Sequence, residues 1–155
     1  MTEKQIFVEG ELSDAAKESI RLIQNEIEKI VSADIKEFTY KALSEVDGKF
    51  WTSPASSTGK YHPAEDNGEG GLVRHVVKGV AVVEQSLRRD IATQREVDIA
   101  ISAFLLHDTC KNGVVWESNF TDYTHGSIAS KWLEKFELID ETAKREILSA
   151  VRYHM

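Results

Sequence analysis

Residues 99–111 read IAISAFLLHDTCK: a nearly continuous apolar run that ends in His107, Asp108 and a short polar segment. Upstream, Thr93 and Glu96 have the spacing of a capping box, a pair of side chains that marks the start of a helix. The sequence therefore predicts a helix that runs from Thr93 to His107. Because this helix is apolar around most of its surface, it belongs in the centre of the domain. Its C-terminal end would carry His107 and Asp108 out of the core.

Other segments also carry apolar residues at three- and four-residue steps, which is the spacing of an amphipathic helix. The predicted helices cover residues 13–31, 35–46, 72–89, 126–136 and 140–154. Ser13 or Asp14 is expected to cap the first of them, and Asp140 the last. No segment has the alternating pattern of a strand, and we find no repeat. The fold class is therefore predicted to be all-α.

Length and composition fit one globular unit. The 155 residues are 41% hydrophobic, which is enough for a single core. We expect residues 1–50 to form an N-terminal helical support for a functional domain at 51–155. Nineteen basic and 26 acidic side chains give a formal charge of −7. That charge does not suit a protein that coats a phosphate backbone, so nucleic acid is expected only as a substrate.

The sequence indicates a soluble, cytoplasmic protein without membrane contact. Cys110 is the single cysteine, so no internal disulfide can form and an oxidising compartment is not needed. The N-terminal residues MTEKQIFVEGELSD are acidic where a secretory signal needs a basic start and an apolar run. No stretch approaches the roughly 18 apolar residues of a membrane span.

The segment from Trp51 to Gly71 differs in kind from its neighbours. It contains both prolines and four of the nine glycines, so we do not expect a helix there. Loops of this length are uncommon in compact domains unless they serve a site. A flexible linker is the alternative. The presence of Lys60, Tyr61 and His62, which a spacer does not need, favours an active-site loop.

Four of the histidines lie at positions from which their side chains could form one cluster. His75 follows a double glycine, His107 precedes Asp108 at the end of a buried helix, and His125 and His154 lie near helix ends. Imidazole and carboxylate together are common ligands of transition metals, whereas a structural zinc site would want several cysteines. A single histidine on an apolar helix is more often a hydrogen-bonded core residue. A buried helix that ends in two such side chains, however, needs something to offset their desolvation.

The order of these residues resembles a known family. The chain reads His75, then His107-Asp108, His125 and His154, which looks like the H...HD...H...H series of the HD-domain metal-dependent phosphohydrolase superfamily. The strings GGLVRHVVKGV and AFLLHDTCK resemble its GGL-x-x-H and LLHD-x-x-K motifs. PASSTGKYHP, followed by GEGGLVRH, is similar to members that include nucleotide-cleaving hydrolases and 3′-to-5′ exoribonucleases. The resemblance covers residues 51–155 and implies an HD-domain helical bundle. It also implies a long active-site loop between the N-terminal helices and the first ligand-bearing helix.

The resemblance assigns metal ligands residue by residue. His75, His107 and Asp108 match the family's ligands, and Asp108 would bridge the ions if two are bound. His125 and His154 match the additional histidines of the dinuclear members. The implied cofactor is one or two divalent ions of Mn, Fe, Co, Ni, Zn or Mg.

The expected reaction follows from ligand chemistry. A metal held by two histidines and a carboxylate keeps open positions, lowers the pKa of a bound water and polarises a phosphoryl oxygen. We therefore expect hydrolysis of a phosphoester or phosphoanhydride bond of a nucleotide. Asp108 is one expected catalytic residue. Lys111 is the other, since it matches a lysine that contacts phosphate in the family, with a solvated helix-end lysine as the alternative. The expected substrate contacts are Lys60, Tyr61, His62 and Arg74, although Tyr61 and His62 could equally be ordinary packed loop residues.

One departure from the family pattern bears on the site. The family supplies a further aspartate after the last histidine, but this sequence ends one residue after His154. Either the 155 residues are a fragment of a longer protein, or water, another residue or a second chain replaces that aspartate. Two other functions stay open: a 3′-to-5′ nuclease on single-stranded nucleic acid, and a regulatory HD domain that binds a nucleotide without cleaving it. Trp116 and Phe120, expected to be exposed, would suit a homodimer contact.

Overall fold

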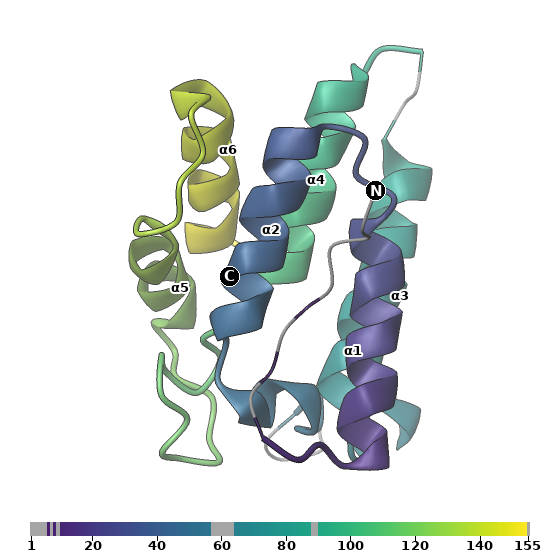
Figure 1. The fold of residues 1–155 in the computed structure, drawn as a ribbon, viewed down its shortest axis with the longest axis vertical. Coiled ribbons are helices and arrows are strands. Elements are labelled where there is room, and N and C mark those ends of the chain that lie inside the picture. Colours follow the sequence, from purple (N-terminus) through teal and green to yellow (C-terminus); the bar gives the residue numbers. More distant parts are fainter. Residues whose placement is uncertain (1–5, 7, 9, 57–63, 88–89, 155) are drawn as a thin grey trace.

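The computed structural model describes residues 6, 8, 10–56, 64–87 and 90–154, and this part of the chain is helical without a strand (Figure 1). The prediction of an all-α fold is confirmed. The elements are α1 (Asp14–Ile27), α2 (Ala33–Glu45), η1 (Gly48–Trp51), η2 (Ala64–Asp66), α3 (Gly71–Ser86), α4 (Gln94–Leu106), α5 (His125–Leu133) and α6 (Glu141–Arg152). Among these helices, none is both long and apolar enough to cross a bilayer.

The predicted helix caps are present. Ser13 Oγ accepts a hydrogen bond from the backbone N–H of Ala16, at 3.2 Å, and α1 begins beside it. The side chain of Thr93 likewise accepts the N–H of Glu96 at 3.1 Å. The Asp140 carboxylate caps α6. These bonds satisfy backbone donors that have no partner inside the helix, which is why the helices begin where the sequence predicts.

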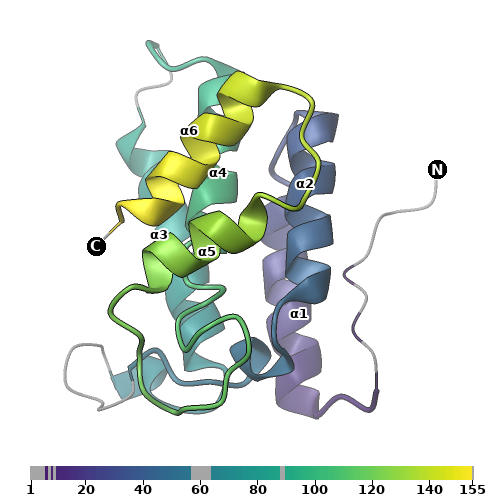
Figure 2. The same ribbon diagram turned by 90° about the vertical axis from the view of Figure 1, so that its left-hand side faces the viewer.

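Helix α4 lies at the centre of the fold, as predicted. It packs against α2, α3 and α6, and both views show it between these helices (Figures 1 and 2). Its side chains Val97, Ile101 and Leu105 are fully or almost fully buried. The C-terminal end of α4 therefore has a fixed position relative to three other helices.

Helix α1 ends earlier than predicted, at Ile27 rather than at Val31. Lys29 and Ile30 already donate to carbonyls three residues earlier, and the carboxylate of Asp98 in α4 then accepts the backbone N–H groups of Val31 and Ser32 at 3.1 and 2.8 Å. A residue whose N–H bonds to Asp98 does not donate it to the carbonyl four residues earlier. The chain therefore leaves the helix, and α2 begins directly afterwards. The apolar spacing misled the prediction because Ile30 is buried even outside the helix.

The segment before α3 contains only the short helices η1 and η2 among its described residues, so the expectation of no α-helix holds there. The backbone N–H of Ala55 donates to the carbonyl of Asp66 at 2.8 Å, which joins the two sides of the loop. A Cβ on Gly71 would lie 1.8 Å from that same carbonyl oxygen. Only glycine fits at this position, and it allows α3 to begin against the turn.

Trp116 is not exposed, and the prediction that it would suit a homodimer contact is wrong. Its relative exposure is 2%. Its backbone N–H donates to Asp47 at 2.9 Å, its indole N–H donates to the carbonyl of Thr109, and its ring meets Phe50 edge to face. These contacts of Trp116 with Asp47 and Phe50 hold the segment after α4 against η1. Phe120 is exposed, as expected.

Candidate metal centre

Four helices bring the candidate ligands to one place. His75 lies on α3, His107 follows the last residue of α4, and Asp108 comes next. His125 is the first residue of α5, and His154 lies two residues after the end of α6. Four of the five predicted metal ligands therefore lie at helix ends, and His75 is the fifth residue of α3.

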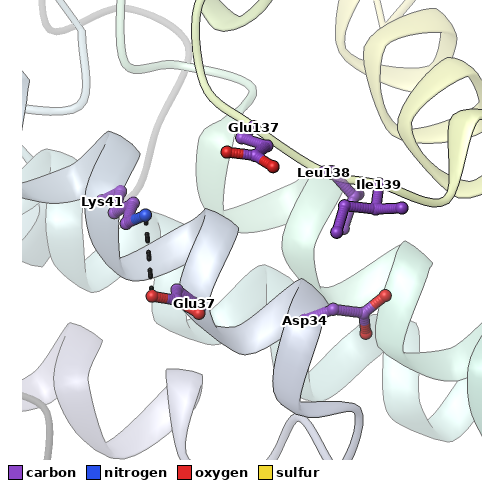
Figure 3. Close-up of a pocket in the computed structure, with 6 residues that line it drawn as sticks. All are labelled: Asp34, Glu37, Lys41, Glu137, Leu138 and Ile139. Atoms are coloured by element: carbon purple, nitrogen blue, oxygen red, sulfur yellow. Dashed lines mark ion pairs between the residues drawn. The ribbon is translucent and has the colours of Figure 1, made fainter.

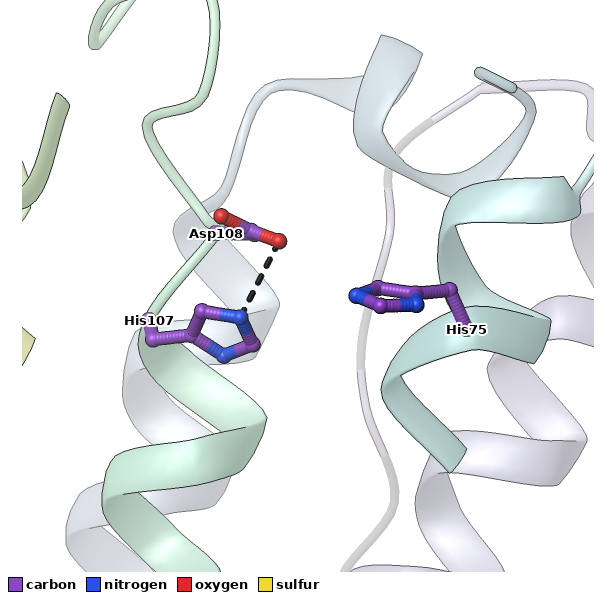
Figure 4. Close-up of side chains that lie close together, drawn as sticks. All are labelled: His75, His107 and Asp108. Carbon is purple, nitrogen blue, oxygen red and sulfur yellow. Dashed lines mark ion pairs between the residues drawn. The ribbon is translucent and has the colours of Figure 1, made fainter. Parts of the chain in front are cut away.

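These side chains form two groups that could hold a metal ion. The α3–α4 group contains His75, His107 and Asp108, and the α5–α6 group contains Asp108, His125 and His154. Within each group, one ligand atom per residue lies within 4.8 Å of the others. The ring of His75 faces the His107–Asp108 pair across a gap (Figure 4). Asp108 belongs to both groups.

The two carboxylate oxygens of Asp108 face different groups. Oδ2 lies 3.1 Å from His107 Nε2, whereas Oδ1 lies 3.1 Å from His125 Nε2 and 3.6 Å from His154 Nε2. Ligand atoms bound tetrahedrally at about 2.1 Å from a metal lie about 3.4 Å from one another. These three separations are close to that value, and a ring nitrogen of His75 lies within 4.8 Å of the other two ligand atoms of the α3–α4 group. The carboxylate thus has the arrangement of a bridge between two cation sites.

Backbone carbonyls set the tautomers of three histidines. Nδ1 of His125 lies 2.6 Å from the carbonyl oxygen of Asp122, and Nδ1 of His154 lies 2.6 Å from that of Val151. His107 Nδ1 makes the same kind of contact with the carbonyl of Phe104. A carbonyl oxygen only accepts, so each Nδ1 carries the hydrogen. In the neutral ring this leaves the Nε2 lone pair for a metal.

The charges in the centre are buried and coupled. Burial acts to raise the pKa of Asp108, but the neighbouring imidazoles, His107 first, outweigh it and hold that pKa well below its usual range. Burial acts to lower the pKa of His107, and the Asp108 carboxylate more than offsets this and raises it. An ionised carboxylate in a buried place requires compensating positive charge. Protons or metal ions can both supply that charge.

Lys111 lies beside the centre rather than in solvent. It is 9% exposed, and its ammonium donates to the backbone carbonyl of Ala55. Burial lowers the pKa of this lysine, and the charge of Asp108 acts in the opposite direction. The alternative of a solvated helix-end lysine is therefore wrong. Next to it is a pocket of about 160 Å³, which Pro54 and Asn119 also line.

Arg74, another predicted substrate contact, belongs to neither metal-binding group of the described residues. The guanidinium of Arg74 donates to the backbone carbonyls of Glu65 and Glu69, at 2.7 and 2.8 Å, and so holds the turn before α3. A substrate-binding role for Arg74 stays a prediction. Lys60, Tyr61 and His62 lie outside the described residues.

Gly126 is a positioning residue that the sequence analysis did not single out. A Cβ there would lie 2.6 Å from the carbonyl oxygen of Arg152 and 3.0 Å from that of Val151. The glycine allows the end of α6 to approach the start of α5, and this approach brings His154 to His125. The signal in the sequence is the pair His125-Gly126 at a predicted helix start.

A second pocket, between α2 and the segment that joins α5 to α6, is a poorer candidate (Figure 3). Three acidic side chains line it, and one of them, Glu37, forms an ion pair with Lys41 at 3.6 Å. The lining residues are Asp34, Glu37, Lys41, Glu137, Leu138 and Ile139. Neither group of described side chains close enough to hold a metal includes any of them.

Comparison of the chain with protein-family models, with curated proteins and with solved structures gave no match. The function is therefore inferred from the chemistry of the clustered residues.

Proposed function

We propose that this protein is a metal-dependent phosphohydrolase with an HD-domain helical bundle, and that it cleaves a phosphoester or phosphoanhydride bond of a nucleotide. The observation that carries the proposal is the position of Asp108, whose Oδ2 lies close to His107 and whose Oδ1 lies close to His125 and His154. Two adjacent divalent ions that share a carboxylate are a common arrangement for cleaving phosphate esters.

The donor set fits one or two ions of Mn, Fe, Co, Ni, Zn or Mg, with nitrogen donors favouring the transition metals. Such ions would supply Lewis acidity and a bound water of lowered pKa. His75 and His107 would hold the first ion with Asp108, and His125 and His154 the second. Each group provides three donors, so positions remain for water and substrate.

The protein's own residues would orient the ligands and neutralise charge on the substrate. The carbonyls behind His107, His125 and His154 hold the rings in place, so little reorganisation accompanies the reaction. Lys111 is a buried cation close enough to Asp108 for their charges to interact. From there its ammonium would neutralise charge that develops on the phosphoryl group.

A regulatory domain that binds a nucleotide without cleaving it would be expected to have an incomplete ligand set. Both groups have three donors among the described residues, which favours the enzyme. A 3′-to-5′ nuclease would use the same centre.

A metal-supplemented hydrolysis screen tests the proposal. The purified protein, with added Mn, Co or Ni, is expected to hydrolyse nucleotides or a generic phosphodiester, and Asp108→Ala to abolish the activity. Asp14→Ala is the control, since it removes an exposed aspartate of α1 that lies outside both metal groups. The absence of bound metal, together with no hydrolysis after metal addition, would contradict the proposal.

A further inference from the structure

The pocket beside Lys111 lies between two segments of the chain that are distant in sequence. Its volume is about 160 Å³. One wall belongs to the segment that follows η1, and the other to the loop that joins α4 to α5, which passes beside η1 (Figure 2). The lining residues are Ser53, Pro54, Lys111, Asn112, Trp116 and Asn119. We call this site the Lys111 pocket. Of its lining residues, Lys111 alone has a role in the proposed hydrolysis.

The Lys111 pocket adjoins the metal centre. The backbone N–H of Lys111 donates to the carbonyl of Asp108 at 3.1 Å, so the two residues belong to one turn. The ammonium of Lys111 donates to the carbonyl of Ala55, in the segment that follows η1. An ammonium group has three donors, so this bond leaves others for a ligand. The pocket and the metal centre are therefore neighbours that share Lys111.

Hydrogen bonds hold the loop wall of the pocket in place. The side-chain amide of Asn112 donates to the carbonyl of Ser118 at 2.9 Å. The ammonium of Lys49, on η1, donates to the carbonyl of Trp116 at 2.7 Å. Sites for small molecules are mostly formed before the ligand arrives, because ordering a loop during binding costs free energy. The Lys111 pocket has this property.

The lining combines apolar surfaces with amide groups. Pro54 and Trp116 are mainly apolar, whereas Asn112 and Asn119 carry amides that both donate and accept hydrogen bonds. Asn119 is exposed, and its amide has no hydrogen-bond partner among the described residues. A free phosphate would use the polar groups and leave the apolar surfaces without a partner. A flat heterocyclic ring, with apolar faces and a polar edge, matches both kinds of surface.

The size of the pocket matches one six-membered ring. An engineered apolar cavity of about 150 Å³ is large enough to bind benzene. The Lys111 pocket, at about 160 Å³, offers similar space. A pyrimidine base is a single six-membered ring with donors and acceptors along its edge. A purine carries a second, fused ring, for which this volume leaves little room.

We propose that the Lys111 pocket binds the pyrimidine base of the substrate and that Asn119 helps to select this base. The inference rests on the proposed function and narrows its nucleotide to one that carries uracil or cytosine. The amide of Asn119 would pair with the edge of the ring, and Pro54 would cover one of its faces. An asparagine amide offers one acceptor and a donor group, so it can pair with uracil and with cytosine.

Base recognition can be measured apart from cleavage, because nucleosides have no phosphate to remove. The ligands are uridine, cytidine, adenosine and ribose, and the readout is a ¹H–¹⁵N NMR titration of the full chain with Zn²⁺, which is diamagnetic. Uridine and cytidine are expected to bind at least about tenfold more tightly than adenosine, and ribose is expected not to shift the Asn119 amide signal. Asn119→Ala should raise the Kd of uridine about fivefold, the effect of one hydrogen bond.

Asn25→Ala is the matched control, because it removes an exposed asparagine from α1, which contributes none of the described lining residues. It should leave the Kd of uridine unchanged. Equal Kd values for uridine and adenosine would overturn the inference, as would an unchanged Kd in Asn119→Ala. If uridine binding depends on Asn119 but no phosphoester is hydrolysed with any metal, the proposed function fails and the pocket assignment stands. Hydrolysis of UMP and AMP with the same KM would support the proposed function and overturn this inference.

Discussion

The Nε2 atoms of His125 and His154 lie 3.0 Å apart, although 29 residues separate the two histidines in the chain. Both rings already use Nδ1 to donate to backbone carbonyls. In their neutral forms the two Nε2 lone pairs therefore face one another and the Asp108 carboxylate. Three electron-rich atoms in one place require a cation between them, either a proton or a metal ion.

The two ligand groups can be separated by substitution. His154→Ala is expected to remove one bound ion and leave the α3–α4 group, whereas His75→Ala should remove the other ion. Isothermal titration calorimetry with Mn²⁺, combined with elemental analysis, gives the stoichiometry. If either variant binds as many ions as the unmodified protein, its histidine is not a ligand.

Gly126→Ala should weaken the α5–α6 group without removing a ligand. The added Cβ would meet the carbonyl oxygens of Arg152 and Val151, so the end of α6 must shift and carry His154 with it. We expect metal affinity in this group to fall at least about tenfold, and the free energy of unfolding to fall by about 1–3 kcal/mol. Gly48→Ala is the control, since no atom lies within 4 Å of its added Cβ. Unchanged metal binding in Gly126→Ala would show that this close approach does not position His154.

Asp98→Asn should destabilise the fold. The buried carboxylate accepts hydrogen bonds from the backbone of Val31 and Ser32, from the Ser32 hydroxyl and from the Gln94 amide. An amide has one acceptor oxygen where the carboxylate has two, so some of these donors lose their partner. The expected cost is about 2 kcal/mol in the free energy of unfolding, measured by urea denaturation at neutral pH. A loss below the error of the measurement would contradict the assigned role.

The Asp98 carboxylate should also make the stability of the fold depend on pH. Burial acts to raise the pKa of Asp98, but hydrogen bonds from Ser32 and Gln94 outweigh it and lower the pKa in the folded protein. The stabilisation is therefore fully present above the unfolded pKa, about 3.9, and is lost as pH falls through the lower folded value. The difference in stability between the unmodified protein and Asp98→Asn should shrink below about pH 4. A difference that does not change with pH would show that the charge of Asp98 is not what stabilises α2.

Much of the helical structure could be predicted because local signals and burial agree. The caps at Thr93 and Asp140 and the apolar helix α4 are examples. The end of α1 could not be predicted, because the residue that accepts hydrogen bonds from the N–H groups of Val31 and Ser32 is Asp98, which is distant in the sequence. Trp116 was misplaced for a similar reason, since its burial depends on Asp47 and Phe50 of an earlier segment.

The metal ligands could be selected from residue type and order, but their geometry could not. Nothing local to Asp108 indicates that its oxygens face different groups. The carbonyls of Phe104, Asp122 and Val151, which orient the rings, are backbone atoms that every residue type provides. Each contact joins a histidine to the carbonyl three residues earlier, so it depends on the backbone conformation at that place and not on the type of the residue that provides the carbonyl.

The most direct test of the metal centre is a calorimetric titration of metal-free protein with Mn²⁺, run in parallel on Asp108→Ala and on the control Asp14→Ala. The shared position of Asp108 predicts that the unmodified protein and the Asp14→Ala control bind two ions, and that Asp108→Ala loses both sites together. Binding by Asp108→Ala with the affinity and stoichiometry of the unmodified protein would contradict the account, as would the absence of binding in all three.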